Sequence, residues 1–193
     1  MSRTLVVMAL RTERAALHRH VAGATLARTG MGPDRAGRWR PGADLARLQA
    51  AVITGLAGGL APDARPGEVV VATEVRDDAG SLALPGAVAL AGRLADAGHP
   101  VRLGPIVTTS RLVGGAAERA ALAAAGAIAV DMESAPLART LGARVAVAVV
   151  RIVVDTPTTP LLRLATVPAG IAALRRLRAI GPIIGAWDGA GAG

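Results

Sequence analysis

Two acidic side chains, Glu133 and Asp155, each follow a run of apolar residues. The first run, at residues 127–130, reads AIAV and precedes Asp-Met-Glu-Ser, and the second, at 145–154, reads VAVAVVRIVV. Short apolar runs that end in polar residues are typical of buried strands, and ligands of open α/β sheets bind where such strands end. A carboxyl group placed there is partly removed from water, which raises its pKa and keeps it protonated. Asp155 is therefore a candidate general acid.

A single charged residue, Arg151, interrupts the second apolar run. A buried guanidinium needs a partner of opposite charge, because an isolated charge is very costly in an apolar interior. Glu13, which follows the first apolar run of the chain, and Glu133 are the candidate partners. Asp131 is expected to cap the helix that begins after it. Together these residues predict a charged cluster at one end of a sheet.

Two glycine-rich segments could bring the backbone close to a ligand. Gly30 and Gly32 follow a weak strand, as in dinucleotide-binding loops, but Pro33 comes next and Val52 stands where an acid is required. That interpretation is disfavoured. Residues 55–60 read GLAGGL, and such glycines allow close approach, with amides available for an oxyanion. A tight turn between a strand and a loop is the alternative for this segment.

Apolar runs and amphipathic segments alternate along the whole chain. Strands are expected at residues 4–10, 24–29, 51–54, 68–76, 101–108, 127–130 and 145–154. Helices are expected at 13–20, within 34–48, at 85–97, at 116–125, through position 141 and at 167–180, with loops at 77–81, 110–115 and 156–165. This alternation favours a single three-layer α/β domain with a central mixed sheet flanked by helices. The domain is expected to span residues 1–187, and residues 188–193 to form a disordered tail.

The composition argues against several classes of protein. The chain of 193 residues has a net charge of +8, and all 22 of its basic residues are Arg. These are scattered, and two Trp are the only aromatic residues, which argues against a surface for nucleic acids. The lack of Cys excludes a disulfide framework and is consistent with the cytoplasm. No apolar run reaches the ~18 residues of a membrane-spanning helix.

Five segments together resemble the nucleoside phosphorylase and nucleosidase superfamily. They are LVVMALRTERAAL, TGMGPDRA, VITGLAGGLAPDARPGEVVVA, TTSRLVGGAAERAALAAAGAIAVDMESAPLA and VRIVVD, and they fall in this order between residues 5 and 155. VDMES combined with GLAGGL and GEVVVA carries the resemblance, since neither part is specific alone. TGMGP, the short loop at 77–81 and the C-terminal TVPAGIAALRRLRAIGPIIGAW are most similar to the hopanoid-associated phosphorylase branch.

The resemblance implies cleavage of the N-glycosidic bond of a purine nucleoside. Asp155 then matches the acid that protonates the leaving base. Glu133 matches the carboxylate that binds the ribose hydroxyls, while Glu13 and Arg151 match groups that orient the nucleophile. The other implied contacts are Met132 with the sugar, Leu112 and Val113 with the base, and Ala57 and Gly58 with the substrate.

The branch resemblance further implies an adenosylated triterpenoid as substrate, phosphate as co-substrate and a place in hopanoid biosynthesis. The arginine that usually binds phosphate in purine phosphorylases is missing, so Arg11, Arg14 and Gly55 are the phosphate candidates. No other cofactor and no metal are expected, and the protein is expected to form a homo-oligomer.

Two departures from the family pattern leave alternatives open. Val154 and Leu56 stand where relatives often have Ser, next to the acid and near the nucleophile respectively. One alternative is a hydrolytic nucleosidase that acts on methylthioadenosine or adenosylhomocysteine. The other is a nucleoside-binding module without catalytic activity.

Overall fold

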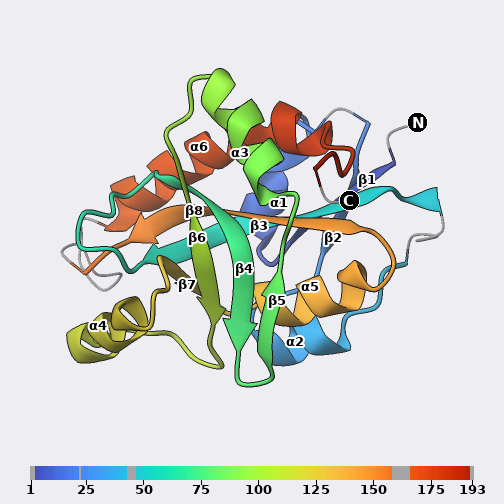
Figure 1. Ribbon diagram of the computed structural model, residues 1–193. Coiled ribbons are helices and arrows are strands. Elements are labelled where there is room, and N and C mark those ends of the chain that lie inside the picture. Colours follow the sequence, from blue (N-terminus) through green and yellow to red (C-terminus); the bar gives the residue numbers. More distant parts are fainter. Residues whose placement is uncertain (1–2, 22, 43–46, 158–165, 192–193) are drawn as a thin grey trace.

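The computed structural model describes residues 3–21, 23–42, 47–157 and 166–191 (Figure 1). The strands of this part are β1 (Thr4–Met8), β2 (Thr25–Arg28), β3 (Ala50–Gly59), β4 (Val69–Asp77), β5 (Gly80–Ala83), β6 (Val101–Thr108), β7 (Ala129–Asp131) and β8 (Ala146–Asp155). The helices are α1 (Arg11–Leu17), α2 (Pro33–Arg38), α3 (Ala87–Asp96), α4 (Ala116–Ala124), α5 (Ser134–Gly142) and α6 (Thr166–Gly185). None of these helices is long and apolar enough to cross a membrane.

The strands of the described chain form one mixed sheet, in agreement with the expected fold class. Hydrogen-bonded neighbours run in the order β2-β1-β3-β7-β6-β4-β5, and β8 pairs with both β3 and β4. Strand β8 thereby closes β3, β7, β6 and β4 into a ring, from which β1 with β2 and β5 extend. Because β3 and β8 are parallel and paired as far as Gly58 and Asp155, both long strands end at the same place.

Side-chain alternation along β8 separates two apolar layers, because successive residues of a strand point to opposite faces. The even-numbered residues 148–154 pack in the cluster that includes side chains of α1, α3 and α6. The odd-numbered residues 147, 149 and 153 pack in the cluster that includes side chains of α2 and α5. Figure 1 shows these helices on the two sides of the sheet and α4 apart from both. Position 151 is odd, so the strand directs Arg151 toward α5.

Three elements differ from the sequence expectation. Strand β3 continues through the glycines to Gly59 instead of ending at position 54, because β8 pairs with it along this stretch. Residues 80–83 form β5, which pairs with β4 in a tight hairpin where a loop was expected. Helix α6 extends to Gly185 although Pro182 lies within it. The buried side chains of Ile184 and Trp187 stabilise this extension by packing on the core.

Two further expectations concern parts that are only partly described. Of the loop expected at 156–165, residues 158–165 lie outside the described residues, as do residues 192 and 193 of the expected tail. Within the described part of that tail, Asp188 forms an ion pair with Arg93 of α3 at 3.5 Å. The described part of the tail therefore contacts the domain at this point.

Candidate active site

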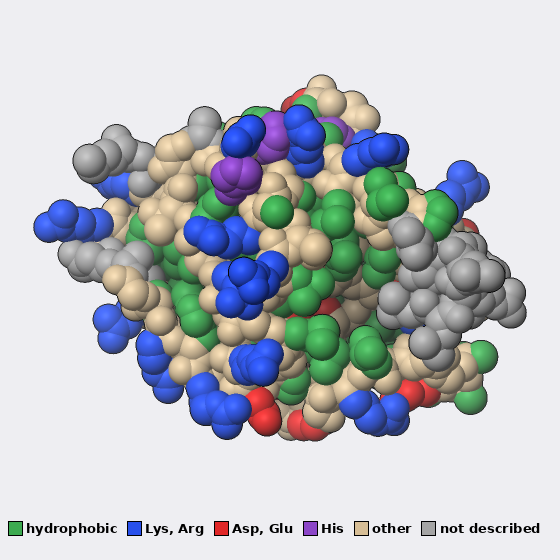
Figure 2. All heavy atoms as spheres, turned by 180° about the vertical axis from the view of Figure 1, so that it is seen from behind, with side chains coloured by type: hydrophobic (Ala, Val, Ile, Leu, Met, Phe, Trp, Pro, Cys, Tyr) green, Lys and Arg blue, Asp and Glu red, His purple; other side chains and the backbone are tan. Residues whose placement is uncertain are grey.

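A cavity of about 180 Å³ lies where β8 ends, beside the start of α1 and the end of β7. Four carboxylates line it, those of Glu13, Asp131, Glu133 and Asp155. Most other lining side chains are apolar, among them Leu10, Met31, Leu56, Leu112, Met132 and Val154. In Figure 2 a patch of hydrophobic side chains surrounds a small acidic area, with Arg and His side chains beside it. The cavity is thus an apolar pocket with a few convergent charges, which is the usual form of a small-molecule site.

The guanidinium of Arg151 is fully buried behind the cavity. Its Nε lies 2.8 Å from Oδ2 of Asp131, and its Nη2 lies 3.6 Å from Oε2 of Glu133. Nε and Nη2 also donate to Oγ of Ser134 at 3.1 and 2.9 Å, and Nη1 donates to the carbonyl of Thr54 at 3.2 Å. The expected pairing with Glu133 is present, but Asp131 is the closer partner. The charge is therefore compensated and hydrogen-bonded, as a buried charge requires.

Asp131 organises the start of α5. Its Oδ1 accepts hydrogen bonds from the amides of Glu133 and Ser134 at 3.3 and 3.2 Å and from Oγ1 of Thr108 at 2.7 Å. Glu133 occupies the N-cap position, but its side chain makes no capping bond. Asp131 thus bonds the first amides of the helix, close to the expected capping role, while its second oxygen pairs with Arg151.

Glu133 reaches from α5 to the glycine segment between β2 and α2. Its Oε1 accepts a hydrogen bond from the amide of Gly32 at 2.8 Å. The φ of Gly32 is +99°, a left-handed value that favours glycine. Burial raises the pKa of the Glu133 carboxyl, Arg151 opposes this shift, and the nearby Asp131 carboxylate adds to it. Glu133 is therefore a buried carboxyl group whose protonation depends on burial and on the charges around it.

Glu13 is held in place by backbone amides. Its Oε2 accepts from the amides of Ala9 and Leu10 at 3.1 and 2.8 Å, and its Oε1 accepts from the amide of Leu56 at 2.9 Å. A Cβ at Gly55 would lie 2.6 Å from Oε1 of Glu13 and 2.7 Å from Nη1 of Arg151, and the φ of Gly55 is +141°. Only glycine fits at this point of β3. Gly55 is therefore a packing requirement within a strand, which corrects its expected role in a phosphate-binding loop.

Asp155 lies at the end of β8 and pairs with a residue that the sequence did not single out. Its Oδ2 accepts a hydrogen bond from Nη2 of the buried Arg119 in α4, whereas its Oδ1 has no hydrogen-bond partner among the described residues. Burial raises the pKa of the Asp155 carboxyl, and Arg119 opposes this shift. The sequence gives no sign of Arg119, because an Arg in an Ala-rich helix resembles any solvent-exposed Arg.

The remaining candidate residues fall into two groups. Met132, Leu112, Ala57 and Gly58 line the cavity as expected. Val113 does not, because its side chain packs beneath the cavity wall with Leu60, Ala127 and Val130. It supports the lining rather than forming it.

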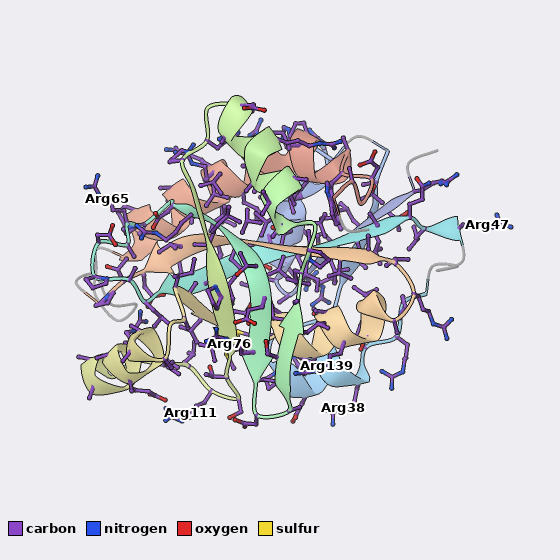
Figure 3. All side chains as sticks on the ribbon, viewed as in Figure 1. Arg38, Arg47, Arg65, Arg76, Arg111 and Arg139 are labelled. Atoms are coloured by element: carbon purple, nitrogen blue, oxygen red, sulfur yellow. The ribbon has the colours of Figure 1, made fainter. Side chains whose placement is uncertain are left out.

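Arg11 and Arg14 do not line the cavity. They lie in a separate exposed hollow with His18 and Arg28, because Glu13 and Leu17 occupy the buried face of α1. The expectation that these arginines face the cavity is thereby corrected. Other arginines are dispersed, and Figure 3 shows Arg47, Arg65 and Arg111 at widely separated places on the periphery.

The two ends of this arrangement differ in charge. At one end a single carboxyl, Asp155, faces the cavity beside one cation. At the other end three carboxylates, those of Glu13, Asp131 and Glu133, surround the single cation of Arg151. The first end can transfer a proton to a ligand, and the second can stabilise positive charge that develops on it.

The sequence model of the Phosphorylase superfamily matches residues 9–169. The fold is similar to that of the 5′-methylthioadenosine/S-adenosylhomocysteine nucleosidase from Neisseria meningitidis, with a TM-score of 0.74 and 20% identity over 95% of this chain and 96% of that one. It is also similar to a futalosine hydrolase mutant of Helicobacter pylori, with a TM-score of 0.75 and 14% identity over 94% and 98% of the two chains. A search of curated protein sequences found no significant match.

Proposed function

Because the chain belongs to the phosphorylase superfamily, we propose that it cleaves the N-glycosidic bond of a 5′-substituted adenosine with water and releases adenine. The observation that carries this proposal is the pairing of a proton-donating end, at Asp155, with a negatively charged end around Arg151 in one cavity. Glycosidic cleavage needs a proton on the leaving base and negative charge near the sugar. We further propose that the reaction takes place in the cytoplasm.

Asp155 supplies the proton. As the bond between C1′ and the base breaks, its electron pair moves into the purine, and the proton of Asp155 passes to a ring nitrogen. The products of this step are neutral adenine, a ribosyl cation and an Asp155 carboxylate. Oδ1 is buried and has no hydrogen-bond partner among the described residues, and burial raises the pKa of the carboxyl, which favours its protonated form.

Glu133 binds the ribose. A carboxylate that accepts hydrogen bonds from two vicinal hydroxyls makes charge-assisted bonds, which are stronger than those of an amide. Met132, which precedes it in the cavity wall, packs against the sugar. The positive charge that develops on the ribose is then stabilised by Glu133 and its neighbouring carboxylates.

Water is the nucleophile that the charges favour. A phosphate dianion would meet the carboxylates of Glu13, Asp131 and Glu133. The cation behind them, Arg151, is already paired with Asp131. Two like unit charges 4 Å apart repel by about 4 kcal/mol at an effective dielectric constant of 20. A neutral water avoids this repulsion, and Glu13 is positioned to accept its proton.

The 5′ group is proposed to be apolar. Met31 and Leu112 line the cavity and are 53% and 63% exposed, so large apolar side chains border its opening. This border suits groups from methylthio to the triterpenoid that the sequence resemblance implies. Phosphorolysis of an adenosylated triterpenoid is therefore kept as the second candidate. The apolar opening favours the triterpenoid substrate, whereas the carboxylates of the cavity disfavour phosphate as the nucleophile.

The test is adenine release from a panel of adenosines with 5′-hydroxyl, 5′-methylthio, 5′-homocysteinyl and 5′-alkyl groups. We expect release from the apolar 5′ derivatives, with higher kcat/KM than for adenosine itself. The Asp155→Asn variant serves as the catalytic blank. Tight binding of the panel without any adenine release by the wild type would contradict the proposal and indicate a nucleoside-binding module.

A further inference from the structure

Arg119 stands out because it is the one buried residue of α4. Its side chain is 4% exposed, although the helix carries it on an outer corner of the molecule (Figure 1). Helices usually attach to a domain through apolar side chains. Leu122 and Ala123 of α4 pack against the domain while partly exposed, whereas the fully buried side chain of the helix is charged. A charge is costly to bury, which indicates a role beyond packing.

Three groups around the cavity converge on this guanidinium. Nε donates to the carbonyl of Val113 at 3.1 Å, and Nη1 donates to the carbonyl of Gly59 at 3.2 Å. Nη2 donates to Oδ2 of Asp155. Arg119 thus connects the segment that holds Leu112, the end of β3 and the proposed acid.

The contact leaves one oxygen of the acid without a hydrogen-bond partner. With Oδ2 bonded to Arg119, Oδ1 has no partner among the described residues. A Cβ at Gly58 would lie 3.2 Å from this Oδ1 and 3.4 Å from Nη1 of Arg119, tighter than ordinary contacts. The glycine therefore leaves room for the carboxyl and the guanidinium to lie side by side.

We propose that Arg119 is the positioning residue of the acid: it directs Oδ1 of Asp155 toward the leaving base and stabilises the carboxylate that remains after proton transfer. This inference rests on the proposed function. The proton moves from Oδ1 to a ring nitrogen of the purine, and the negative charge left on Asp155 is matched by Arg119. The other charged groups around the cavity are Glu13, Asp131 and Glu133 with Arg151, and these form the separate cluster described above.

The direction of the effect follows from the opposing influences on the acid. Burial raises the pKa of Asp155 and Arg119 lowers it. Removal of the cation would leave a neutral but weaker acid. Turnover should then fall, while the alkaline limb of the kcat profile, where Asp155 loses its proton, should move to higher pH.

The experiment compares Arg119→Met and Arg119→Lys with the control Arg139→Met. Arg139 pairs with Asp77 outside the cavity, so its loss removes an Arg–Asp pair without touching the acid. Each variant is assayed with 5′-methylthioadenosine and with an N7-methylated purine nucleoside. The base of the second substrate already carries a positive charge, so it can leave without receiving a proton from Asp155. Thermal unfolding confirms that each variant is folded.

We expect Arg119→Met to lower kcat for 5′-methylthioadenosine about 10- to 100-fold, part of the usual effect of a general acid. KM should change little, and the alkaline limb of the kcat profile should move to higher pH. Cleavage of the N7-methylated substrate should be nearly unaffected, Arg119→Lys should recover part of the loss, and Arg139→Met should match the wild type.

Equal losses on both substrates, or an unmoved alkaline limb, would overturn the role of Arg119 and reduce it to an anchor of α4. If Arg119→Met does not fold, the same comparison is made with Arg119→Lys, which keeps the charge but cannot make all three bonds. A wild type that cleaves neither substrate would overturn the proposed function itself, whereas an active wild type with insensitive variants would overturn only this inference.

Discussion

Arg151 and Arg119 are both buried beside the same cavity, yet their surroundings differ. Arg151 pairs with Asp131 at 2.8 Å and with Glu133 at 3.6 Å, with Glu13 also nearby. Arg119 meets one carboxylate and two backbone carbonyls. The region around Arg151 therefore has more negative than positive charges, and the region around Arg119 is balanced.

Both arginines are buried, so burial does not distinguish them. The number of carboxylates around each guanidinium does. An excess of carboxylates suits a place where a ligand becomes positively charged. A balanced pair suits a group that must gain and lose one proton. Each region can be altered without the other, which allows the comparison to be tested.

The largest effect is expected from the balanced region. Asp155→Asn removes the proton donor but keeps the size of the side chain, and turnover should fall about 10²- to 10⁴-fold, the usual scale for general acid catalysis. Adenine release measures this directly. Asp77→Asn is the control, because it removes a carboxylate paired with Arg139 outside the cavity. If Asp155→Asn kept wild-type turnover, the region around Arg119 would not supply the proton, and the assigned difference between the two regions would be wrong.

The next effect concerns stability in the charge-rich region. Arg151→Met leaves buried carboxylates without their cation, and breaking a buried ion pair in this way costs about 3–5 kcal/mol. Urea unfolding at neutral pH provides the measurement. Arg139→Met breaks a partly exposed pair and should cost at most about 1 kcal/mol. Similar losses in the two variants would mean that Arg151 does not hold the cluster together.

A smaller effect is expected on sugar binding. Glu133→Gln replaces a carboxylate by an amide, and a hydrogen bond to a charged group contributes about 1.5–3 kcal/mol. Values of kcat/KM for ribosides should fall roughly 10- to 100-fold on this basis. A 2′,3′-dideoxy analogue has no hydroxyls to donate and should be much less affected. If riboside and analogue suffer alike, Glu133 has a structural role only.

The smallest effect is a change in how stability depends on pH. Burial raises the pKa of Glu133 in the folded protein, so the native state holds this proton more tightly than the unfolded state does. Its contribution to stability therefore declines as pH rises from the unfolded-state pKa through the folded-state pKa. Glu133→Gln cannot lose a proton, so the variant should show a shallower decline in urea unfolding across this window. If the stability of the variant and of the wild type depended on pH in the same way, the raised pKa of Glu133 would be contradicted.

Much of the charged cluster could be predicted from local sequence. Asp155, Glu133 and Glu13 each stand at or near the end of an apolar run, and Arg151 interrupts one. The ends of neighbouring strands meet at one edge of a sheet, so these residues were expected together and lie together. The strand period also accounts for the direction of Arg151, because it shares a face with residues 149 and 153.

What the sequence could not indicate depends on long-range geometry. Arg119 is 36 residues from Asp155 and lies on a helix whose pattern matches solvent exposure. Arg11 and Arg14 have helical spacing, but which face of α1 is buried is decided by packing against the rest of the domain. Gly55 looked like part of a loop because glycines usually end strands, whereas its pairing with β8 keeps it within β3.

The identity of the nucleophile tests the charge comparison most directly. Wild-type protein is incubated with 5′-methylthioadenosine in phosphate-free buffer and again with added phosphate, and the sugar product is identified by mass spectrometry. With three carboxylates around one arginine, we predict equal rates of adenine release and free methylthioribose in both buffers. A requirement for phosphate, with a ribose 1-phosphate derivative as the product, would contradict this account.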